Sequence, residues 1–457
     1  MRTNLLDQLP LTPVPIIHSH AAELREMSDF LDQLPEAVRL VHEDLCCRGK
    51  RRIDPTKGRD GLAAEQVLRI GLLKQLTGQS YEALAFSLVD SGTYRAFCRI
   101  GFDRKPMKKS RLQKNIKRVK AETWEAINKM VILKAKESGI EKGTKARTDC
   151  TVVETNIHHP NDSSLLGDCV RVLTRLMRNA KEKFGLKFTN HRLRAKRRVL
   201  GISNAKSMKK RMPLYRDLIL VTEETVSDAK DIVEGLGSVC CETVVDGAIA
   251  DGIAAELKHF IPLSERVLEQ TKRRVLDGET VPPTEKLFSI FEPHTDIIIK
   301  GARDIQYGHK VCLTTGASTL VTDVVIESGN PSDSVLAPKM IARHEELFSE
   351  VPQQAVFDGG FATRDNLDKL KQMGVKDVVF HKRRGIETDE MASSKRVYKQ
   401  LRAFRAGIEA TISFLKRSFG FARCTWRSLD SFRAYTYSSV LACNLLVVAR
   451  HLLAARA

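Results

Sequence analysis

The sequence contains few aromatic residues and no cysteine pattern typical of a metal or redox site. Phe, Trp and Tyr together make up 6% of the 457 residues. The ten cysteines include no C-x-x-C pair, which argues against a zinc ribbon and against a thioredoxin-like redox motif. Hydrophobic residues still account for 42% of the chain, so the composition predicts a folded protein with a core rather than a disordered one.

The sequence also lacks a long uninterrupted apolar run. The N-terminal segment Met1–Pro10 includes Asp7 and shows no apolar stretch of the kind found in signal peptides. The most apolar stretch, Ser438–Ala455, is interrupted by polar residues that include Asn444 and Arg450. We expect it to form a buried C-terminal helix rather than a membrane span. These features predict a cytoplasmic protein with reduced cysteines and no membrane contact.

Acidic residues are in the minority. Lys and Arg number 75 and Asp and Glu number 56, which gives a formal net charge of +19. This balance favours a polyanionic partner, with nucleic acid as the first candidate and an acidic membrane surface as the alternative.

Two segments contain no acidic residue at all. Arg104–Lys120 and His191–Arg211 each hold nine Lys or Arg residues. A solvated helix face is the alternative interpretation, but the missing acidic partners favour contact with DNA phosphates. The residues from which we expect these contacts are Lys114, Lys117 and Arg118 in the first segment and Arg197 and Arg198 in the second.

The first 140 residues have a helical pattern. Apolar residues recur at helical spacing over Leu62–Thr77, and Gly78-Gln79-Ser80 then separates this helix from a second one that Ser80 can cap. Two helices joined by a short turn are compatible with a helix-turn-helix motif and equally with a small helical bundle. We predict that residues 1–140 form a helical DNA-binding domain.

The order of elements after residue 140 predicts an α/β fold. With a helical block set aside, three antiparallel strands lead into alternating helix and strand, which matches the ribonuclease-H-like fold, a layered mixed sheet. The expected strands cover 146–157, 309–315, 319–328, 354–357 and 377–380, with helices through 346, over 364–373 and from about 395. We therefore expect a catalytic core from 145–165 and 305–425, a mostly helical basic insertion at 166–304 and a C-terminal helical segment at 426–457.

Three acids fall on elements that lie side by side in such a fold. Asp149 lies in the first strand, Asp358 ends a later strand before two glycines, and Glu409 lies in the long helix. Hydrolysis of a phosphodiester needs stabilisation of both the attacking and the leaving oxygen, and two divalent ions held by hard oxygen ligands provide it. The acids therefore predict a site for two Mg²⁺ or Mn²⁺ ions. Each acid alone is weak evidence, since Asp-Gly-Gly is a common turn.

The long helix gives the strongest local support. Leu401, Ile408 and Leu415 belong to one apolar stripe, and Arg402, Arg405, Glu409 and Lys416 lie beside it on the helical wheel. A glutamate at the rim of the buried face can bind metal while neighbouring cations hold phosphates. The alternative is an ordinary surface pair between Arg405 and Glu409. Lys310 opens the second strand and is a further candidate for DNA contact.

These motifs resemble the DDE transposases of bacterial insertion sequences. The family has an R-(3)-E-(6)-K motif, which Arg405, Glu409 and Lys416 match, and its two aspartate segments resemble RTDCTVVETNIHHPNDSSLL and VFDGGF. The segment GLAAEQVLRIGLLKQLTGQSYEALAFSL resembles the family's N-terminal helical domain. Within the family, the pattern resembles the loosely classified ISNCY group. Arg402 stands where the motif often has tyrosine, so a tyrosine-specific role is not expected.

The resemblance implies a mechanism and partners. Metal-activated water would cut DNA at the terminal inverted repeats, and the freed 3′-hydroxyl would attack target DNA in the same site. Arg405, Lys416, Arg402 and Lys310 would position phosphates. It also implies a homo-oligomer on DNA, in bacterial cytoplasm at the nucleoid. The alternatives are a non-catalytic DNA-binding regulator derived from a transposase and a ribonuclease-H-like nuclease without strand transfer.

Overall fold

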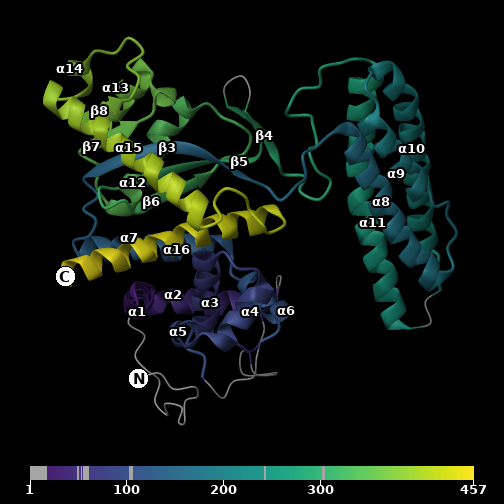
Figure 1. Ribbon diagram of the computed structural model, residues 1–457, viewed down its shortest axis with the longest axis horizontal. Helices are drawn as coiled ribbons and strands as arrows, with labels where there is room; N and C mark the ends of the chain where they lie inside the picture. Colours follow the sequence, from purple (N-terminus) through teal and green to yellow (C-terminus); the bar gives the residue numbers. More distant parts are fainter. Residues whose placement is uncertain are drawn as a thin grey trace, which may run out of the picture.

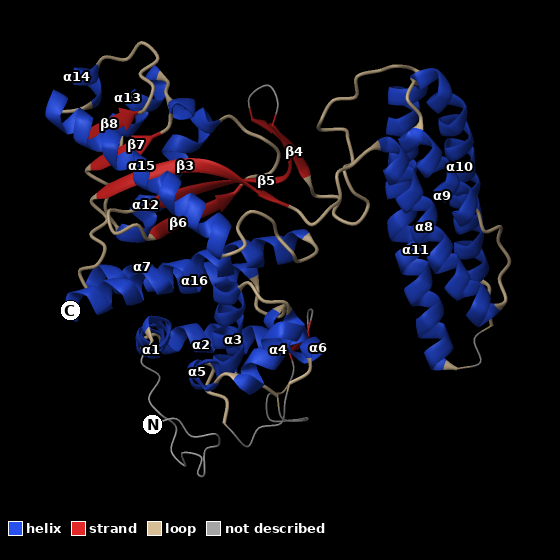
Figure 2. Ribbon diagram, in the orientation of Figure 1, coloured by secondary structure: helices blue, strands red, loops and turns tan. Residues whose placement is uncertain are grey.

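The computed structural model describes residues 18–456, apart from 49–50, 53, 55–60, 102–106, 241–242 and 301–303. The chain forms a mixed α/β structure in which helices predominate (Figures 1 and 2).

The N-terminal part is a group of helices packed around α3. Gly78, whose positive φ of 62° suits glycine, ends α3, and the Ser80 side chain accepts a hydrogen bond from the backbone of Ala83 to begin α4. Most of α3 is buried, as expected for the central helix of a bundle. The elements are α1 (Ser19–Asp32), α2 (Pro35–Leu45), β1 (Cys47–Arg48), β2 (Arg51–Arg52), α3 (Ala64–Thr77), α4 (Tyr81–Asp90), α5 (Gly92–Phe97), α6 (Lys109–Ile116) and α7 (Ala121–Glu137).

The last helix, α16 (Leu429–Arg456), completes this group. It runs along α7 and also contacts α1 and α3 (Figure 1). By length and composition α16 could cross a membrane, but 61% of its most apolar window is buried inside the structure. The buried C-terminal helix expected from the sequence is therefore present. Its Asn444 side chain bonds the backbone of Val321 and the side chain of Asn128, which ties the helices to the sheet.

The sheet is mixed and centres on β3 (Lys145–Glu154). On one side β3 pairs with β5 (Asp304–Thr315) in antiparallel fashion, and on the other it is parallel to β7 (Gln354–Phe357), which is parallel to β8 (Asp377–Phe380). The far edge of β5 pairs with β6 (Val321–Ile326) and, at its other end, with β4 (Asp296–Lys300). The helices that accompany these strands are α12 (Leu336–Phe348), α13 (Arg364–Gln372), α14 (Thr388–Met391) and α15 (Lys395–Ser418), with the short turns η2 (Asp333–Val335) and η3 (Gly359–Phe361).

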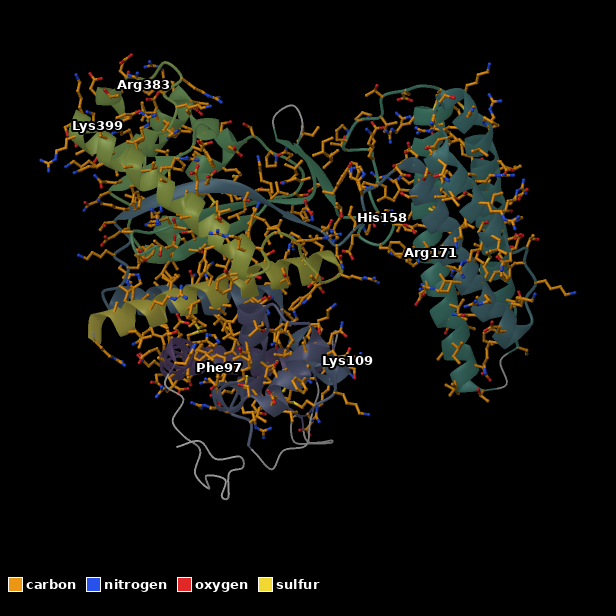
Figure 3. The ribbon with its side chains drawn as sticks, in the orientation of Figure 1. Phe97, Lys109, His158, Arg171, Arg383 and Lys399 are labelled. Carbon is orange, nitrogen blue, oxygen red and sulfur yellow. The ribbon has the colours of Figure 1, made fainter. Side chains whose placement is uncertain are left out.

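Four helices between β3 and β4 form a unit beside the sheet (Figure 1, right). They are α8 (Asp162–Phe184), α9 (Arg192–Asn204), α10 (Met208–Gly237) and α11 (Val244–Thr271), which continues as a π-helical turn, η1 (Lys272–Leu276). They bury a hydrophobic cluster of their own, separate from the two clusters that line the sheet. Figure 3 labels His158 where the chain passes from the sheet towards this helical unit, and Arg171 on α8.

Most predicted strands and helices are confirmed, with one difference. The block assigned to 166–304 was expected to lie outside the sheet, but its last part, β4, joins the sheet as an edge strand. The run Asp-Ile-Ile-Ile-Lys is too short to be distinguished from a buried helix segment by periodicity. The hydrogen-bonded pairing with β5 makes this segment a strand.

Candidate active site

The three predicted carboxylates come from three neighbouring elements. Asp149 lies in β3, opposite Leu313 of β5. Asp358 directly follows β7, and Glu409 lies in α15. Strands β3 and β7 are adjacent and parallel, and α15 packs across both. Strand pairing and the packing of α15 thus bring acids that are distant in sequence together over the central strands of the sheet.

A single arginine joins the three acids. Nη2 of Arg405 lies 3.3 Å from Oδ2 of Asp149 and 3.2 Å from Oδ1 of Asp358, and Nη1 donates to Oε1 of Glu409 at 2.7 Å. Because one nitrogen contacts both aspartates, their carboxylates face the same point. The structure therefore brings together the three acids and the arginine that the sequence singled out.

The site is closed towards the sheet and open towards solvent at α15. The exposed fraction of the side chain rises from 10% for Arg405 and 17% for Asp149 to 38% for Asp358 and 60% for Glu409. Water therefore screens the contact between Arg405 and Asp149 least, although its two atoms are slightly farther apart than those of the other two pairs. The open side at Glu409 is where a substrate as large as a nucleic-acid strand can approach.

Arg147 holds α15 against β3, a role that the sequence analysis did not assign. It is buried, and it donates from Nε to Thr315 Oγ1 at 2.9 Å and from Nη1 to the carbonyl of Phe404 at 2.8 Å. A Cβ on Gly407 would lie 1.9 Å from Nη1, so only glycine allows this approach. Since side chains alternate along a strand, Arg147 shares a strand face with Asp149. That alternation was the signal available in the sequence.

The donor set suits a hard divalent ion. The three carboxylates offer only oxygen, which Mg²⁺ and Mn²⁺ prefer. Within the described part of the chain, no three His, Cys, Asp or Glu side chains are already arranged around a metal position. The guanidinium of Arg405 lies between the acids and neutralises charge that a metal ion would otherwise neutralise. The oxygen ligands of the three carboxylates therefore fit a divalent ion such as Mg²⁺ or Mn²⁺.

The predicted phosphate-positioning residues near the site differ in exposure. Arg402 is exposed on α15, and Lys416 is half-buried in the last turn of that helix. Arg405 faces the acids rather than solvent, so in this state it does not present its charge to DNA.

Lys310 does not belong to this surface. It pairs with Val152 across the strands, not with Asp149, and therefore points to the opposite face of the sheet. There its ammonium is buried and donates to Asp333 at 2.7 Å and to the carbonyl of Pro331 at 2.6 Å. We correct the prediction that Lys310 contacts DNA, because this side chain is held inside the fold.

The first basic segment forms an exposed face in its described part. Residues 102–106, which include Arg104 and Lys105, lie outside the described residues. Helix α6 exposes Lys114, and Lys117 follows it, also exposed, while Arg118 is half-buried. Figure 3 labels Lys109 on this helix, below the sheet in that view. The exposed face of α4 instead carries Glu82 and the apolar Phe86, which does not fit a DNA-recognition helix.

The second basic segment is partly neutralised. Arg194 and Arg198 both bind Asp217 of α10. Arg197 is exposed on the outer face of α9, next to the exposed Lys196. Of the two arginines predicted to contact phosphates here, Arg197 is therefore available and Arg198 is bound to an acid.

Comparison with known protein families identifies two segments. Residues 271–445 match the family described as Transposase DDE domain, and residues 17–118 match the family described as Transposase domain (DUF772). The chain belongs to the DDE transposases of insertion sequences. Neither the curated proteins nor the solved structures provide a match to this transposase.

The family matches cover only part of the candidate site. The DDE match includes Asp358, Arg405, Glu409 and Lys416, whereas Asp149 lies in neither matched segment. The contact of Asp149 with Arg405 is what connects it to the others. The ISNCY group is a prediction that the family matches do not test.

Proposed function

We propose that this transposase cuts DNA at the ends of its insertion sequence and joins the freed ends to target DNA. The main support is that the carboxylates of Asp149, Asp358 and Glu409 all contact one guanidinium, that of Arg405. Phosphodiester chemistry with two metal ions requires such a triad of acids on neighbouring elements.

We propose further that the sheet is a ribonuclease-H-like core. The order β6-β5-β3-β7-β8, with the first three strands antiparallel and the last two parallel to β3, supports this assignment. In that scheme the helical unit α8–α11 is an insertion between the first two strands, and the N-terminal helices form a DNA-binding domain.

Each residue of the site has a proposed task. The three carboxylates would hold two Mg²⁺ or Mn²⁺ ions, which when bound stabilise charge on the attacking and leaving oxygens. Arg147 keeps α15 in place, so that Glu409 stays beside the two aspartates. Arg405 balances the acids before DNA arrives. Lys416 and Arg402 lie on the open side, where they would position phosphates of the bound strand.

The exposed basic residues supply affinity. Lys114 and Lys117 are exposed at the N-terminal helices, and Arg197 is exposed on the helical unit. Exposed cations on two separate parts of the fold suit a partner as extended as a duplex. We expect the protein to act on nucleoid DNA in the bacterial cytoplasm, as a homo-oligomer that holds both transposon ends.

A strand-transfer assay tests the proposal. The full chain is incubated with labelled transposon-end DNA, unlabelled target DNA and Mg²⁺. Joined products are the expected result. Nicks without joining would identify a nuclease, and gel shifts without either would identify a DNA-binding regulator. Both outcomes would overturn the proposed function.

A further inference from the structure

A cavity of about 530 Å³ lies where the N-terminal helices meet the segment before α16. Its wall includes the turn between α3 and α4, the end of α6 and residues 425–427. Three of the residues that line it are cations, Lys74, Lys117 and Arg427, and none is an Asp or Glu. A hollow with this charge suits an anion.

Lys74 is the unusual member of this group. Its residue is only 6% exposed, yet no ion pair between described residues involves it. The ammonium donates to the carbonyl of Gln79 at 3.2 Å and lies 4.9 Å from the ring centre of Tyr81. Buried lysines are rare without a counter-charge. Burial lowers the pKa of Lys74, which reflects the cost of keeping this charge away from water.

The groups nearest to Lys74 cannot supply the missing negative charge. Burial raises the pKa of the Cys424 thiol to about 12 and raises the pKa of the Tyr81 hydroxyl, so both are neutral at physiological pH. The hydrogen-bond donors Tyr81 Oη and Trp426 Nε1 are also buried and have no partner among the described residues. A cation and two unused donors are thus left beside one cavity.

The mouth of the cavity is continuous with the basic face of α6. Lys117 and Arg427 are exposed at its rim, and the exposed Lys114 lies three residues before Lys117, on α6. A polyanion lying on α6 would therefore reach this opening.

We propose that the cavity binds a phosphate group of the DNA backbone. The proposal rests on the proposed function in that DNA is the partner, and it adds a specific anchoring point. The phosphate would take the place of a counter-ion for Lys74, and Lys117 and Arg427 would hold it from the rim.

Lys74→Met is the principal test variant, because methionine keeps the length of the side chain and removes the charge. Arg427→Gln tests the rim. Lys376→Met, at the exposed turn between α13 and β8, is the matched control. In thermal unfolding without ligand we expect Lys74→Met to be at least as stable as the wild type, since an uncompensated buried charge is removed. Inorganic phosphate should then raise the Tm of the wild type and the control but not of Lys74→Met.

Duplex DNA binding is measured against salt concentration in EDTA, so that cleavage plays no part. Lys74→Met and Arg427→Gln should each lower the slope of log affinity against log salt by about 0.9, the value for one phosphate contact. Lys376→Met should leave the slope unchanged. A Lys74→Met protein that unfolds at a lower temperature and keeps the wild-type slope would show a structural lysine and overturn the proposal.

Two other outcomes are also decisive. A response to inorganic phosphate with equal DNA slopes in all variants would mean that the cavity binds a free phosphate, and the DNA assignment would be wrong. Failure of the wild type in strand transfer, with the slope changes as expected, would remove the transposase mechanism and leave the phosphate site standing.

Discussion

The carboxylate site and the helical unit α8–α11 both contain an arginine–aspartate contact, in very different surroundings. At the site, the side chain of Arg405 is 10% exposed and contacts acids from three elements. In the helical unit, Arg194 and Arg198 share Asp217, and their side chains are 44% and 38% exposed. Exposed pairs contribute little to stability because water and salt screen them, whereas buried ones are screened much less.

This contrast separates two uses of charge in one chain. Around Arg405 each charged side chain is held by its contacts with the others. Replacing any one of them therefore changes the interactions of the remaining ones. On the helical unit the charges act together through their field, so one can be lost at small cost. Substitutions of the same chemical kind in the two regions should therefore have unequal effects, and those effects can be ranked.

The largest effect is expected from removing one carboxylate charge at the site. Asp149→Asn, Asp358→Asn and Glu409→Gln should each lower cleavage by at least roughly 100-fold, since loss of a mere supporting partner around a metal already costs 10–100-fold. DNA binding measured by gel shift should stay close to wild type. Asp217→Asn in the helical unit is the matched control and should retain cleavage. Wild-type cleavage by any of the three site variants would exclude that residue from the triad.

The second prediction concerns Arg405. Arg405→Ala should lower the free energy of unfolding in EDTA by about 1–3 kcal/mol, because three neighbouring carboxylates lose their shared cation. Mg²⁺ should then stabilise this variant more than it stabilises the wild type, because the ion no longer competes with the guanidinium. Urea unfolding with and without Mg²⁺ measures both effects. Arg194→Ala, in an exposed pair, should change stability by less than about 1 kcal/mol. Equal stabilisation of Arg405→Ala and of the wild type by Mg²⁺ would contradict the competition between the ion and the guanidinium of Arg405.

The contrast also explains what the sequence could predict. The strands over 354–357 and 377–380 are short apolar runs with turn residues at their ends, so both they and Asp358 could be found locally. Glu409 was found from the apolar stripe of its own helix. β4 was missed because its strand form depends on pairing with β5, which is a non-local contact.

Two side-chain directions could not be predicted. Lys310 was assigned beside Asp149, but the register places it opposite Val152, and an odd offset moves a side chain to the other face of a sheet. Arg405 was expected to hold phosphates, whereas the packing of α15 on β3 directs it into the acids. Both depend on how two elements meet, and no local pattern encodes that.

The third prediction compares two adjacent arginines in the helical unit. Arg197→Gln should lower the salt slope of DNA binding by about 0.9, because Arg197 is exposed and has no acid partner among the described ion pairs. Arg198→Gln should change the slope less, since Asp217 already binds that guanidinium. Cleavage at saturating DNA should be normal in both. Equal slopes for the two variants would mean that α9 does not touch DNA or that the pair with Asp217 opens on binding.

The smallest effect concerns a buried histidine in the core of the sheet region. His344 of α12 donates from Nε2 to the carbonyl of Gly143 at 2.8 Å, and its Nδ1 is buried without a hydrogen-bond partner among the described residues. Burial lowers the pKa of His344, although Glu141 and Asp323 nearby favour its charged form. The folded protein therefore binds fewer protons than the unfolded chain, in which histidine has a pKa of about 6.5.

The stability that comes from neutral His344 is fully present above about pH 6.5 and is lost as the pH falls from there through the lowered folded pKa. The free energy of unfolding, measured by urea titration between pH 8 and pH 5, should decline over that range in the wild type. His344→Gln, which can still donate to Gly143, should decline less. His259→Gln, on α11 of the helical unit, serves as the control and should follow the wild type. If the free energy of unfolding of His344→Gln declines as steeply as that of the wild type, another group causes the loss of stability at low pH. The histidines of the core and of the helical unit would then not differ in their effect on stability.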